Sequence, residues 1–293
     1  MKMNDQCLPC LMNQVIKVAN ITNAQDREAL YTKVFKYLST LDFKETNPEI
    51  VGGTFEIIKN HIQNEDPYKE LRNYYNELFL EKSKAIEERI ETGLTPFETA
   101  LKYAIIGNII DFNPIHSITE KDIMGYFDKA DDLSLVINDA NQLKEDIKAS
   151  HTLLYLGDNC GEICLDKLFL KQIKSINPHI NIHFGVRGTP VVNDSIEADA
   201  YFVGINEYAK IISNGDRSLG TVLHRTSKAF QEIYNKADIV IAKGQGNYES
   251  LSEETEKNIY YLLMTKCNVI ASDIKVPQNS LVCLNLNNKH SVS

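Results

Sequence analysis

The sequence lacks long apolar runs, an excess of basic residues and a dense set of cysteines. No stretch of the 293 residues approaches the roughly 18 consecutive apolar residues of a membrane-spanning helix, so we expect no membrane partner. The 40 acidic residues outnumber 31 basic ones, and the formal net charge of -9 argues against a nucleic-acid-binding protein. Six cysteines, with no secretory signal in the first residues, fit a reducing cytoplasm better than a disulfide-linked secreted protein.

The composition that remains is that of an ordinary soluble globular protein. Hydrophobic residues make up 43% of the chain and charged residues 24%. This length allows one large or two modest domains with an ample core, and it leaves the oligomeric state open. Because the net negative field repels anions, an anionic substrate would need a local cluster of cations or a bound metal.

The first part of the chain has mostly helical periodicity. Between about residues 12 and 127, apolar residues recur at helical spacing, as in Leu71, Tyr75 and Leu78. Proline and glycine residues divide this region into several helices. We therefore expect residues 1–130 to form a helical portion.

The pattern changes from residue 131 onwards. A helix is expected at about residues 133–149, and short apolar runs then alternate with helical segments. The strand candidates are Leu153–Leu156, Ile180–Val186, Ala200–Val203, Ile239–Ala242, Asn268–Ala271 and Leu281–Leu286. Strands separated by helices predict βαβ units. Residues 131–293 are therefore predicted to form an α/β domain, with a Rossmann-like, mostly parallel sheet and flanking helices.

The clearest candidate site follows the first of these strands. Gly157 ends the apolar run, Asp158 and Asn159 come next, and a helical pattern begins after Gly161. Polar side chains at the carboxyl end of a parallel strand lie where open α/β sheets bind ligands, and a helix amino terminus there favours an anion. Two oxygen-bearing side chains would suit a hard divalent metal beside a phosphate. Alternatively, Asp158 or Asn159 only caps the helix.

Further polar residues follow the later strands. A polar turn at Ser213 ends the helix expected after Ala200–Val203, and the residues that follow strands are Arg187, Asp194, Lys243 and Asn247. Because the carboxyl ends of parallel strands meet at one edge of a sheet, we expect these side chains to converge on the first site.

Together these residues have the chemistry of a metal and phosphate site. Asp158, Asn159 and Asp194 would provide two carboxylates and a carboxamide, which are good ligands for magnesium, manganese or cobalt. Lys243 would supply a positive charge for a phosphate, and the glycines after it would let backbone N–H groups approach. Each feature alone has a simpler explanation as a helix cap, a surface lysine or a turn. Their joint occurrence favours a site for metal-assisted phosphoryl chemistry.

Two other features have more than one interpretation. Cys7 and Cys10 form a CxxC pair, which could be half of a zinc site, a redox pair or two structural thiols at a helix start. No second pair has the same spacing, and this favours a structural role. Asn108 and Asp111 share one face of an otherwise apolar helix and need polar partners. They could cap a neighbouring loop or line a polar pocket.

Several of these blocks resemble the damage-control phosphatase family, also called acidic-residue-methyltransferase-like and formerly a domain of unknown function. The resemblance is carried by Gly157–Ile163, Asn193-Asp194 and Ala237–Leu251. The CxxC pair and the stretch Gly107–Asp111 are similar to the stand-alone prokaryotic branch of that family. These blocks occur in order and cover nearly the whole chain.

The resemblance implies a metal-dependent phosphatase of small phosphometabolites such as sugar phosphates, with a helical portion beside a Rossmann-like sheet. It also implies that Asp158, Asn159 and Asp194 bind a divalent metal (Mg, Mn, Co or Ni) and form the catalytic centre. The candidate substrate-binding residues are Lys243, Asn247, Asn108, Asp111 and Ser213.

The chain departs from the family pattern at two places. Cys160 stands where alanine is common, and a thiol beside a metal ligand could favour zinc or make activity sensitive to oxidation. Leu219 stands before Gly220 and Thr221, where the family usually has proline. The second departure puts the detailed geometry of this loop in doubt.

The sequence leaves alternatives to direct hydrolysis by water. An aspartyl-phosphate route through Asp158 is less favoured, because Cys160 occupies the position where such enzymes usually have a second acid. Methyl transfer to acidic side chains is a second enzymatic hypothesis, although the turn after Gly157 lacks the glycine spacing of a methyl-donor nucleotide site. A third hypothesis is a non-catalytic metal- or nucleotide-binding module.

Overall fold

The computed structural model describes residues 1–109, 125, 127, 130 and 133–288. In chain order its helices are α1 (Cys7–Ile21), α2 (Arg27–Leu38), α3 (Asn47–Ile62), α4 (Lys69–Thr92), α5 (Pro96–Gly107), α7 (Ala140–Ala149), α8 (Glu162–Ile176), α9 (Glu197–Phe202), α10 (Lys228–Lys236), α11 (Gly244–Leu251) and α12 (Asn268–Ile274). The strands are β1 (Leu135–Asn138), β2 (Thr152–Leu156), β3 (Asn181–Val186), β4 (Lys210–Ser213), β5 (Ile239–Lys243), β6 (Ile259–Met264) and β7 (Leu281–Asn285). No helix within these residues is long and apolar enough to span a membrane.

The amino-terminal helices begin at recognisable capping sequences. At the start of α3, Thr46 accepts from the backbone N–H of Glu49, and Glu49 Oε2 accepts from the Thr46 N–H at 2.8 Å. Helix α5 starts with Pro96, which has no N–H group to leave unpaired in the first turn. Helices α1–α5 occupy the first part of the chain, where helical periodicity was predicted, whereas the boundary near residue 130 stays a prediction.

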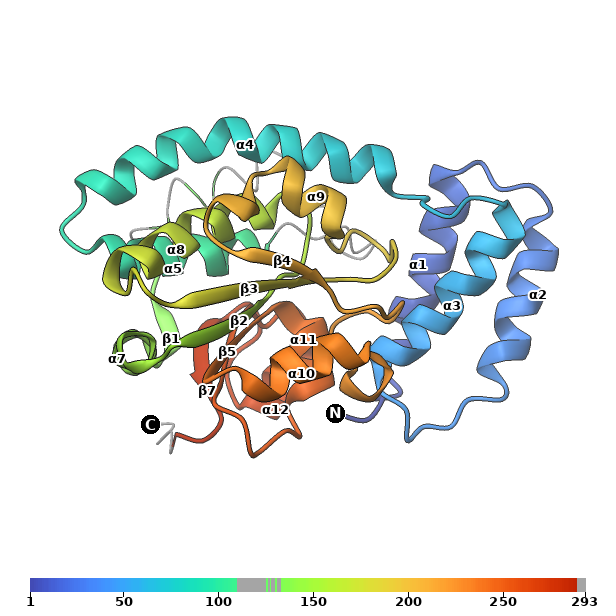
Figure 1. Cartoon of the computed structure of the whole chain (residues 1–293). Helices are drawn as coiled ribbons and strands as arrows, with labels where there is room; N and C mark the ends of the chain where they lie inside the picture. Colours follow the sequence, from blue (N-terminus) through green and yellow to red (C-terminus); the bar gives the residue numbers. More distant parts are fainter. Residues whose placement is uncertain (110–124, 126, 128–129, 131–132, 289–293) are drawn as a thin grey trace.

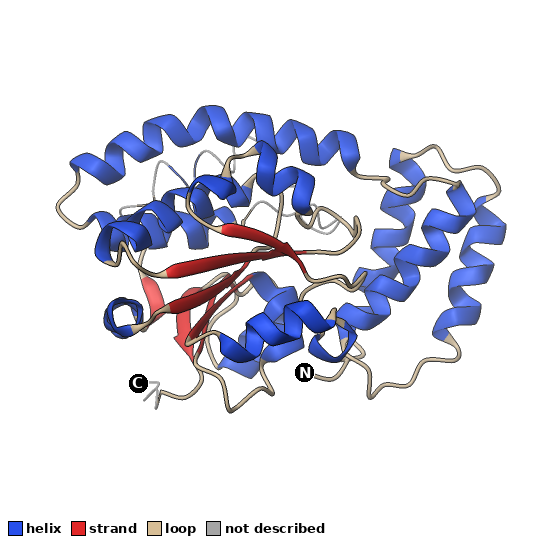
Figure 2. Cartoon of the chain, viewed as in Figure 1, coloured by secondary structure: helices blue, strands red, loops and turns tan. Residues whose placement is uncertain are grey.

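Within the described residues, the strands form one sheet in the order β1-β7-β6-β5-β2-β3-β4. Neighbouring strands are parallel except β6 and β7, which are antiparallel. Figure 2 shows the sheet with helices on both of its sides. The predicted α/β class, with a Rossmann-like and mostly parallel sheet, is confirmed.

The two faces of the sheet bury different sets of apolar side chains. Along β2, Leu153 and Tyr155 belong to one core cluster and Leu154 and Leu156 to the other, because side chains alternate along a strand. The first cluster includes residues of α1–α5 and α8, and the second includes residues of α10, α11 and α12. In Figure 1, α4, α5 and α8 lie over one face, α10, α11 and α12 lie against the other, and α1–α3 stand at one end. The core of the first face thus runs from the helical portion into the sheet.

Five strand assignments differ from the sequence prediction. The segment Ala200–Val203 lies mostly in α9, and Asn268–Ala271 lies in α12, so both predicted strands are wrong. A run of about four apolar residues fits a helical turn as well as a strand. Strands β1, β4 and β6 were not predicted, and β1 lies within the stretch of about residues 133–149 that was expected to be helical throughout. Strand β1 is too short to show a pattern, and β6 is apolar and buried at all of its positions, so it lacks the alternation that identifies a strand.

Candidate active site

The carboxyl ends of β2 and β3 bring Asp158, Asn159 and Asp194 together. The loops that follow these strands pair with each other, since the Ser195 N–H donates to Asp158 O at 2.8 Å and Asn159 and Asp194 form an antiparallel bridge. The two strands are parallel neighbours, so their carboxyl ends lie at the same edge. The three candidate metal ligands therefore meet, as the strand-end argument expected.

A cavity of about 370 Å³ opens at this edge of the sheet. The sheet side of its wall includes Asp158, Asn159 and Asp194. The opposite wall includes Gln14 of α1 and Val51 of α3, so the helical portion helps to enclose it. The volume lies within the range of about 300–1,000 Å³ that is typical of small-molecule sites.

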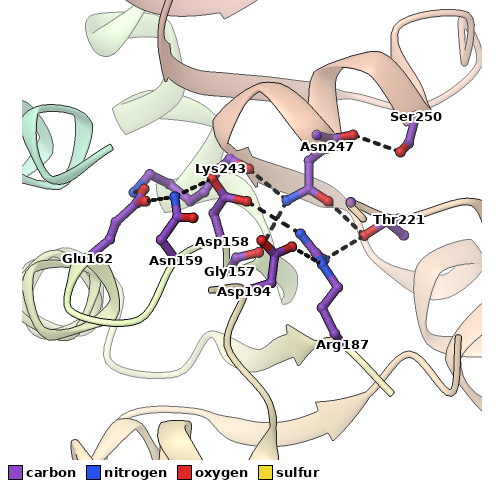
Figure 3. A network of polar contacts seen from close by, with 12 residues as sticks. Gly157, Asp158, Asn159, Glu162, Arg187, Asp194, Thr221, Lys243, Asn247 and Ser250 are labelled. Atoms are coloured by element: carbon purple, nitrogen blue, oxygen red, sulfur yellow. Dashed lines mark hydrogen bonds and ion pairs between the residues drawn. The ribbon is translucent and has the colours of Figure 1, made fainter. Parts of the chain in front are cut away.

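The guanidinium of Arg187 contacts both candidate carboxylates. Its Nε donates to Asp194 Oδ2 at 2.6 Å, and its Nη2 donates to Asp158 Oδ1 at 3.5 Å. Its Nη1 donates to Thr221 Oγ1 at 3.4 Å (Figure 3). Arg187 is only 2% exposed, so water competes little for these contacts. The side chain therefore holds the two aspartates at a defined separation.

This cluster contains more buried acids than buried cations. The acids are Asp158, Glu162, Asp166 and Asp194, and the buried cations that contact them are Arg187 and Lys243. Burial, together with the charges of Asp194 and Glu162, raises the pKa of Asp158 well above its usual range, although Arg187 opposes the shift. Burial also raises the pKa of Asp194, again opposed by Arg187. With all four acids ionised, these six side chains carry an excess of two negative charges.

These residues fit a hard divalent cation. Two carboxylates and a carboxamide are oxygen donors, and the excess negative charge of the cluster equals the charge of one such ion. Within the described part of the chain, no group of three His, Cys, Asp or Glu side chains is placed to hold a metal. The carboxamide of Asn159 would therefore have to complete the protein ligand set with Asp158 and Asp194.

Lys243 lies beneath the sheet edge, and its ammonium group contacts buried protein groups. It is the last residue of β5 and shares the face of Ile241, which packs toward α5 and α8. Its fully buried Nζ donates to Glu162 Oε1 and Asp166 Oδ1 at 2.6 Å each, and to Ala104 O at 2.8 Å. Burial disfavours the charged form, but the two carboxylates outweigh it and raise the pKa of Lys243. A substrate contact of Lys243 stays a prediction.

Asn247 ties together the backbone at the edge of the sheet. Its Nδ2 donates to Lys243 O at 2.7 Å and to Gly157 O at 3.2 Å, which joins the ends of β5 and β2. Its Oδ1 accepts from Thr221 Oγ1 at 2.8 Å. All the described polar atoms of this side chain thus have protein partners, and its predicted role in substrate binding stays untested.

Three further candidates have different outcomes. Asn108 does lie at the site, since its Nδ2 donates to Asp158 Oδ2 at 3.0 Å and to Glu162 Oε2 at 3.2 Å. Ser213 ends β4 away from the cavity lining, and its Oγ accepts from the backbone of the following turn at 3.1 Å. Asp111 lies outside the described residues. Contact with a substrate stays a prediction for all three.

The cysteines separate into two environments. Cys7 and Cys10 line the cavity together with Cys267, and all six cysteines of the chain are free. Burial raises the pKa of Cys7 to about 12, so this thiol does not have the low pKa of a reactive one. Cys160 is fully buried, lies outside the cavity lining and hydrogen-bonds Asp199. Its side chain therefore does not reach the cavity that the candidate ligands line, and the possible effect of this thiol on metal choice or oxidation stays a prediction.

Comparison with known proteins identifies the family. The family model described as the damage-control phosphatase ARMT1-like domain matches residues 3–282. The chain belongs to this damage-control phosphatase family. The resemblance drawn from the sequence motifs is confirmed, and the match spans both the helical portion and the sheet.

Relatives in the damage-control phosphatase family match over almost their whole length. The damage-control phosphatase PH1575 of Pyrococcus horikoshii is 32% identical over 289 residues, covering 97% of this chain and 98% of the relative. A damage-control phosphatase of Archaeoglobus fulgidus is 28% identical over 288 residues, covering 96% and 98%. The crystal structure of the Pyrococcus horikoshii protein, described as a duf89 family protein, superposes with a TM-score of 0.85 at 31% identity, covering 97% of this chain and 99% of that one.

In this damage-control phosphatase family member, the motif analysis missed three residues at the site. Glu162 begins α8, and its Oε1 accepts a hydrogen bond from the buried Nζ of Lys243. Lys266 lines the cavity just after β6, and its charge lowers the pKa of Asp158 against the larger effect of burial. Glu249 lines the cavity from α11. Lys266 could have been found by identifying β6 as a strand, because its end then falls at the same sheet edge.

Proposed function

We propose that this protein is a metal-dependent phosphomonoester hydrolase that acts on small phosphometabolites such as sugar phosphates. The proposal is supported chiefly by the meeting of Asp158, Asn159 and Asp194 in the wall of one cavity that also contains Lys266. This set combines oxygen ligands for a cation with a positive charge for a phosphate, which metal-assisted phosphoryl transfer needs.

Asp158, Asn159 and Asp194 would hold the divalent cation, for which Mg, Mn, Co and Ni are the candidates. When bound, such an ion would place positive charge next to a phosphate oxygen, and it would make a bound water molecule easier to deprotonate. Arg187 keeps Asp194 and Asp158 in place through its hydrogen bonds to both. The protein thus provides a ligand set whose geometry is fixed before a substrate binds.

Lys266 lines the cavity together with these ligands. We assign it the role of offsetting the negative charge of the phosphoryl group. Negative charge spreads over the phosphoryl oxygens in the transition state, so a fixed positive charge lowers the barrier. The first turn of α11 contributes Gln245 and Gly246 to the same cavity, and backbone N–H groups at a helix start have no partner within the helix. These groups would bind the remaining oxygens.

The rest of the cavity suits a small polar metabolite. The carboxamides of Gln14, Asn47 and Gln245 line it, and they can both donate to and accept from hydroxyl groups. The apolar side chains of Leu11 and Leu219 also line it and would pack against a carbon skeleton. This combination of carboxamides and apolar surface supports a sugar phosphate rather than a bulky phosphoprotein.

Direct attack by water is favoured over an aspartyl-phosphate intermediate. Asp158 Oδ2 accepts hydrogen bonds from Asn108 and Asn159, and Oδ1 faces Arg187. A carboxylate enclosed in this way is better suited to bind a cation than to attack phosphorus. The fold also provides no second acid at position 160, where the chain has a buried cysteine.

Hydrolysis of p-nitrophenyl phosphate by metal-stripped protein tests the proposal. Mg²⁺, Mn²⁺, Co²⁺ and Ni²⁺ are restored one at a time to wild type, Asp194→Asn and the exposed-site control Asp42→Asn. We expect turnover to return with metal in wild type and in the control, and to fall at least about 100-fold in Asp194→Asn, since that change removes a ligand charge. A panel of sugar phosphates then identifies preferred substrates.

Two results would contradict the proposal. Absence of turnover with every metal, combined with tight metal or nucleotide binding, would favour the non-catalytic binding module. Heat released on titration with micromolar S-adenosylmethionine would favour the carboxyl methyltransferase. A cytoplasmic location is part of the same proposal and is supported by the six free thiols.

A further inference from the structure

A buried ion-pair network lies beneath the candidate metal ligands. Lys243 Nζ contacts Glu162 Oε1 and Asp166 Oδ1 at 2.6 Å each, and all three side chains are 0% exposed. Asp166 Oδ1 also accepts from Tyr155 OH at 2.7 Å. Asp166 therefore connects Lys243 to the core, whereas Glu162 connects it to the site.

The second carboxyl oxygen of Glu162 is bound by two carboxamides. Its Oε2 accepts from Asn159 Nδ2 at 2.8 Å and from Asn108 Nδ2 at 3.2 Å. The same two nitrogens donate to Asp158 Oδ2, at 2.8 and 3.0 Å respectively. Figure 3 shows Glu162, Asn159 and Asp158 next to one another. Carboxyl oxygens without a proton accept hydrogen bonds, and the NH₂ groups of both carboxamides face these oxygens.

This constraint decides which atom of Asn159 is left for a cation. With Nδ2 held between two carboxylates, Oδ1 lies on the other side of the carboxamide, where Asn193 Nδ2 donates to it at 2.8 Å. Asn159 and Asn193 both line the cavity. A carboxamide oxygen is a ligand for a hard cation, whereas the NH₂ group is a donor with no lone pair to offer. A reversed carboxamide would therefore remove one ligand from the site.

We propose that Glu162 is a positioning residue that fixes the carboxamide of Asn159 with its oxygen toward the metal, and that Lys243 holds the Glu162 side chain in place through their ion pair. The inference rests on the proposed metal-dependent function. It gives the lysine of the Lys-Gly-x-Gly turn a role beneath the site instead of a contact with phosphate. A glutamine at position 162 can donate as well as accept, so it permits the reversed carboxamide.

The test compares two buried acids that share one lysine. Glu162→Gln and Asp166→Asn each remove a carboxylate that contacts Lys243. Of these two acids, only Glu162 also accepts a hydrogen bond from Asn159. Full-length wild type and both variants are stripped of metal, and Mn²⁺ is titrated into each by calorimetry. Urea unfolding in the presence of chelator gives the stability of each protein without metal. The Asp166→Asn variant thus measures the affinity that is lost through charge alone.

We expect Glu162→Gln to weaken Mn²⁺ binding roughly 10- to 100-fold, as loss of a group that orients a metal ligand usually does. Asp166→Asn should weaken it about threefold or less, because its charge is paired and does not orient a ligand. Equal losses in the two variants, or no loss in Glu162→Gln, would overturn the inference while leaving the proposed function intact. A wild type that binds no Mn²⁺ would overturn the proposed function and this inference with it.

A second measurement covers the case in which Glu162→Gln does not fold. The side-chain NH₂ signals of Asn159 can be identified in the NMR spectrum of wild type by their disappearance in Asn159→Asp. We expect these protons to exchange slowly with solvent, because they lie between Glu162 and Asp158. Rapid exchange would contradict the orientation and the inference.

Discussion

Replacement of Glu249 by glutamine tests how strongly burial controls a carboxyl group in the cavity wall. Glu249 is 6% exposed, and both of its carboxyl oxygens accept from Asn47 Nδ2 at 3.2 Å. Burial raises the pKa of Glu249 from 4.5 to about 7, although Asn47 and the amino terminus oppose the shift. In the folded protein this carboxyl group therefore keeps a proton over a pH range in which the unfolded chain loses it.

The sign of the effect on stability follows from proton binding. Between pH 4.5 and about 7 the native state binds more protons at Glu249 than the unfolded chain does. The free energy of unfolding therefore falls as the pH rises through this window and levels off above it. The difference between the two pKa values corresponds to roughly 3 kcal/mol. Glutamine fills the same space and can accept from Asn47 without a charge, so Glu249→Gln should escape this loss.

Urea unfolding of wild type, Glu249→Gln and the exposed control Glu256→Gln at pH 5, 6, 7 and 8 measures the effect. We expect Glu249→Gln to exceed wild type by about 1 kcal/mol at pH 5 and by roughly 3 kcal/mol at pH 8. The control should differ from wild type by the same small amount at every pH. A difference for Glu249→Gln that does not grow with pH would refute the reasoning, because burial would then not hold the proton.

Three further predictions concern the site and its support. An alanine Cβ at Gly244, where φ is +75°, would overlap Asp158 Oδ2, so Gly244→Ala should lower metal-dependent turnover of p-nitrophenyl phosphate roughly 100-fold. Activity within about twofold of the Gly93→Ala control would contradict this geometry. Metal at about 100 times the dissociation constant of wild type should raise the free energy of unfolding of wild type by about 2.7 kcal/mol. An equal gain in Asp194→Asn at the same metal concentration would exclude the proposed ligand set. Phe184→Ala removes a fully buried ring and should cost about 3–5 kcal/mol in urea unfolding, whereas a loss below about 1 kcal/mol would show that the sheet face repacks.

The meeting of the three candidate ligands could be predicted because their placement depends on topology alone. Asp158 and Asp194 follow strands that are recognisable as short apolar runs, and parallel strands end at one edge whatever their exact register. Lys243 shows where this reasoning stops. The strand was expected to end at Ala242, but it includes Lys243, so alternation directs the side chain to α8 and not to the cavity. One residue of strand length therefore decides whether Lys243 faces the cavity or the ion pair beneath it.

Other parts of the site depend on contacts that no local pattern encodes. Lys266 reaches the cavity because β6 pairs with β5, and β6 lacks the alternation that marks a half-buried strand. Glu162 faces Asn159 and Lys243 only through the rotation of α8 about its own axis, which packing against α5 determines. Similarly, the residues of α1 and α3 that line the cavity could be predicted only by knowing how the helical portion packs against the sheet.

The position of β7 between β1 and β6 has a consequence for protein synthesis. Strand β1 ends at Asn138, and its neighbour in the sheet begins only at Leu281. About 140 further residues must therefore be synthesised before β1 can pair, which takes on the order of 10–30 s. Strand β6, which is apolar throughout and ends at Met264, likewise has one row of backbone groups without a strand to pair with until β7 has been made. A chain released before residue 281 would carry this open edge permanently, and such an edge is a template for pairing with other chains. Premature termination near the end of the message should therefore give aggregates rather than a slightly shortened protein.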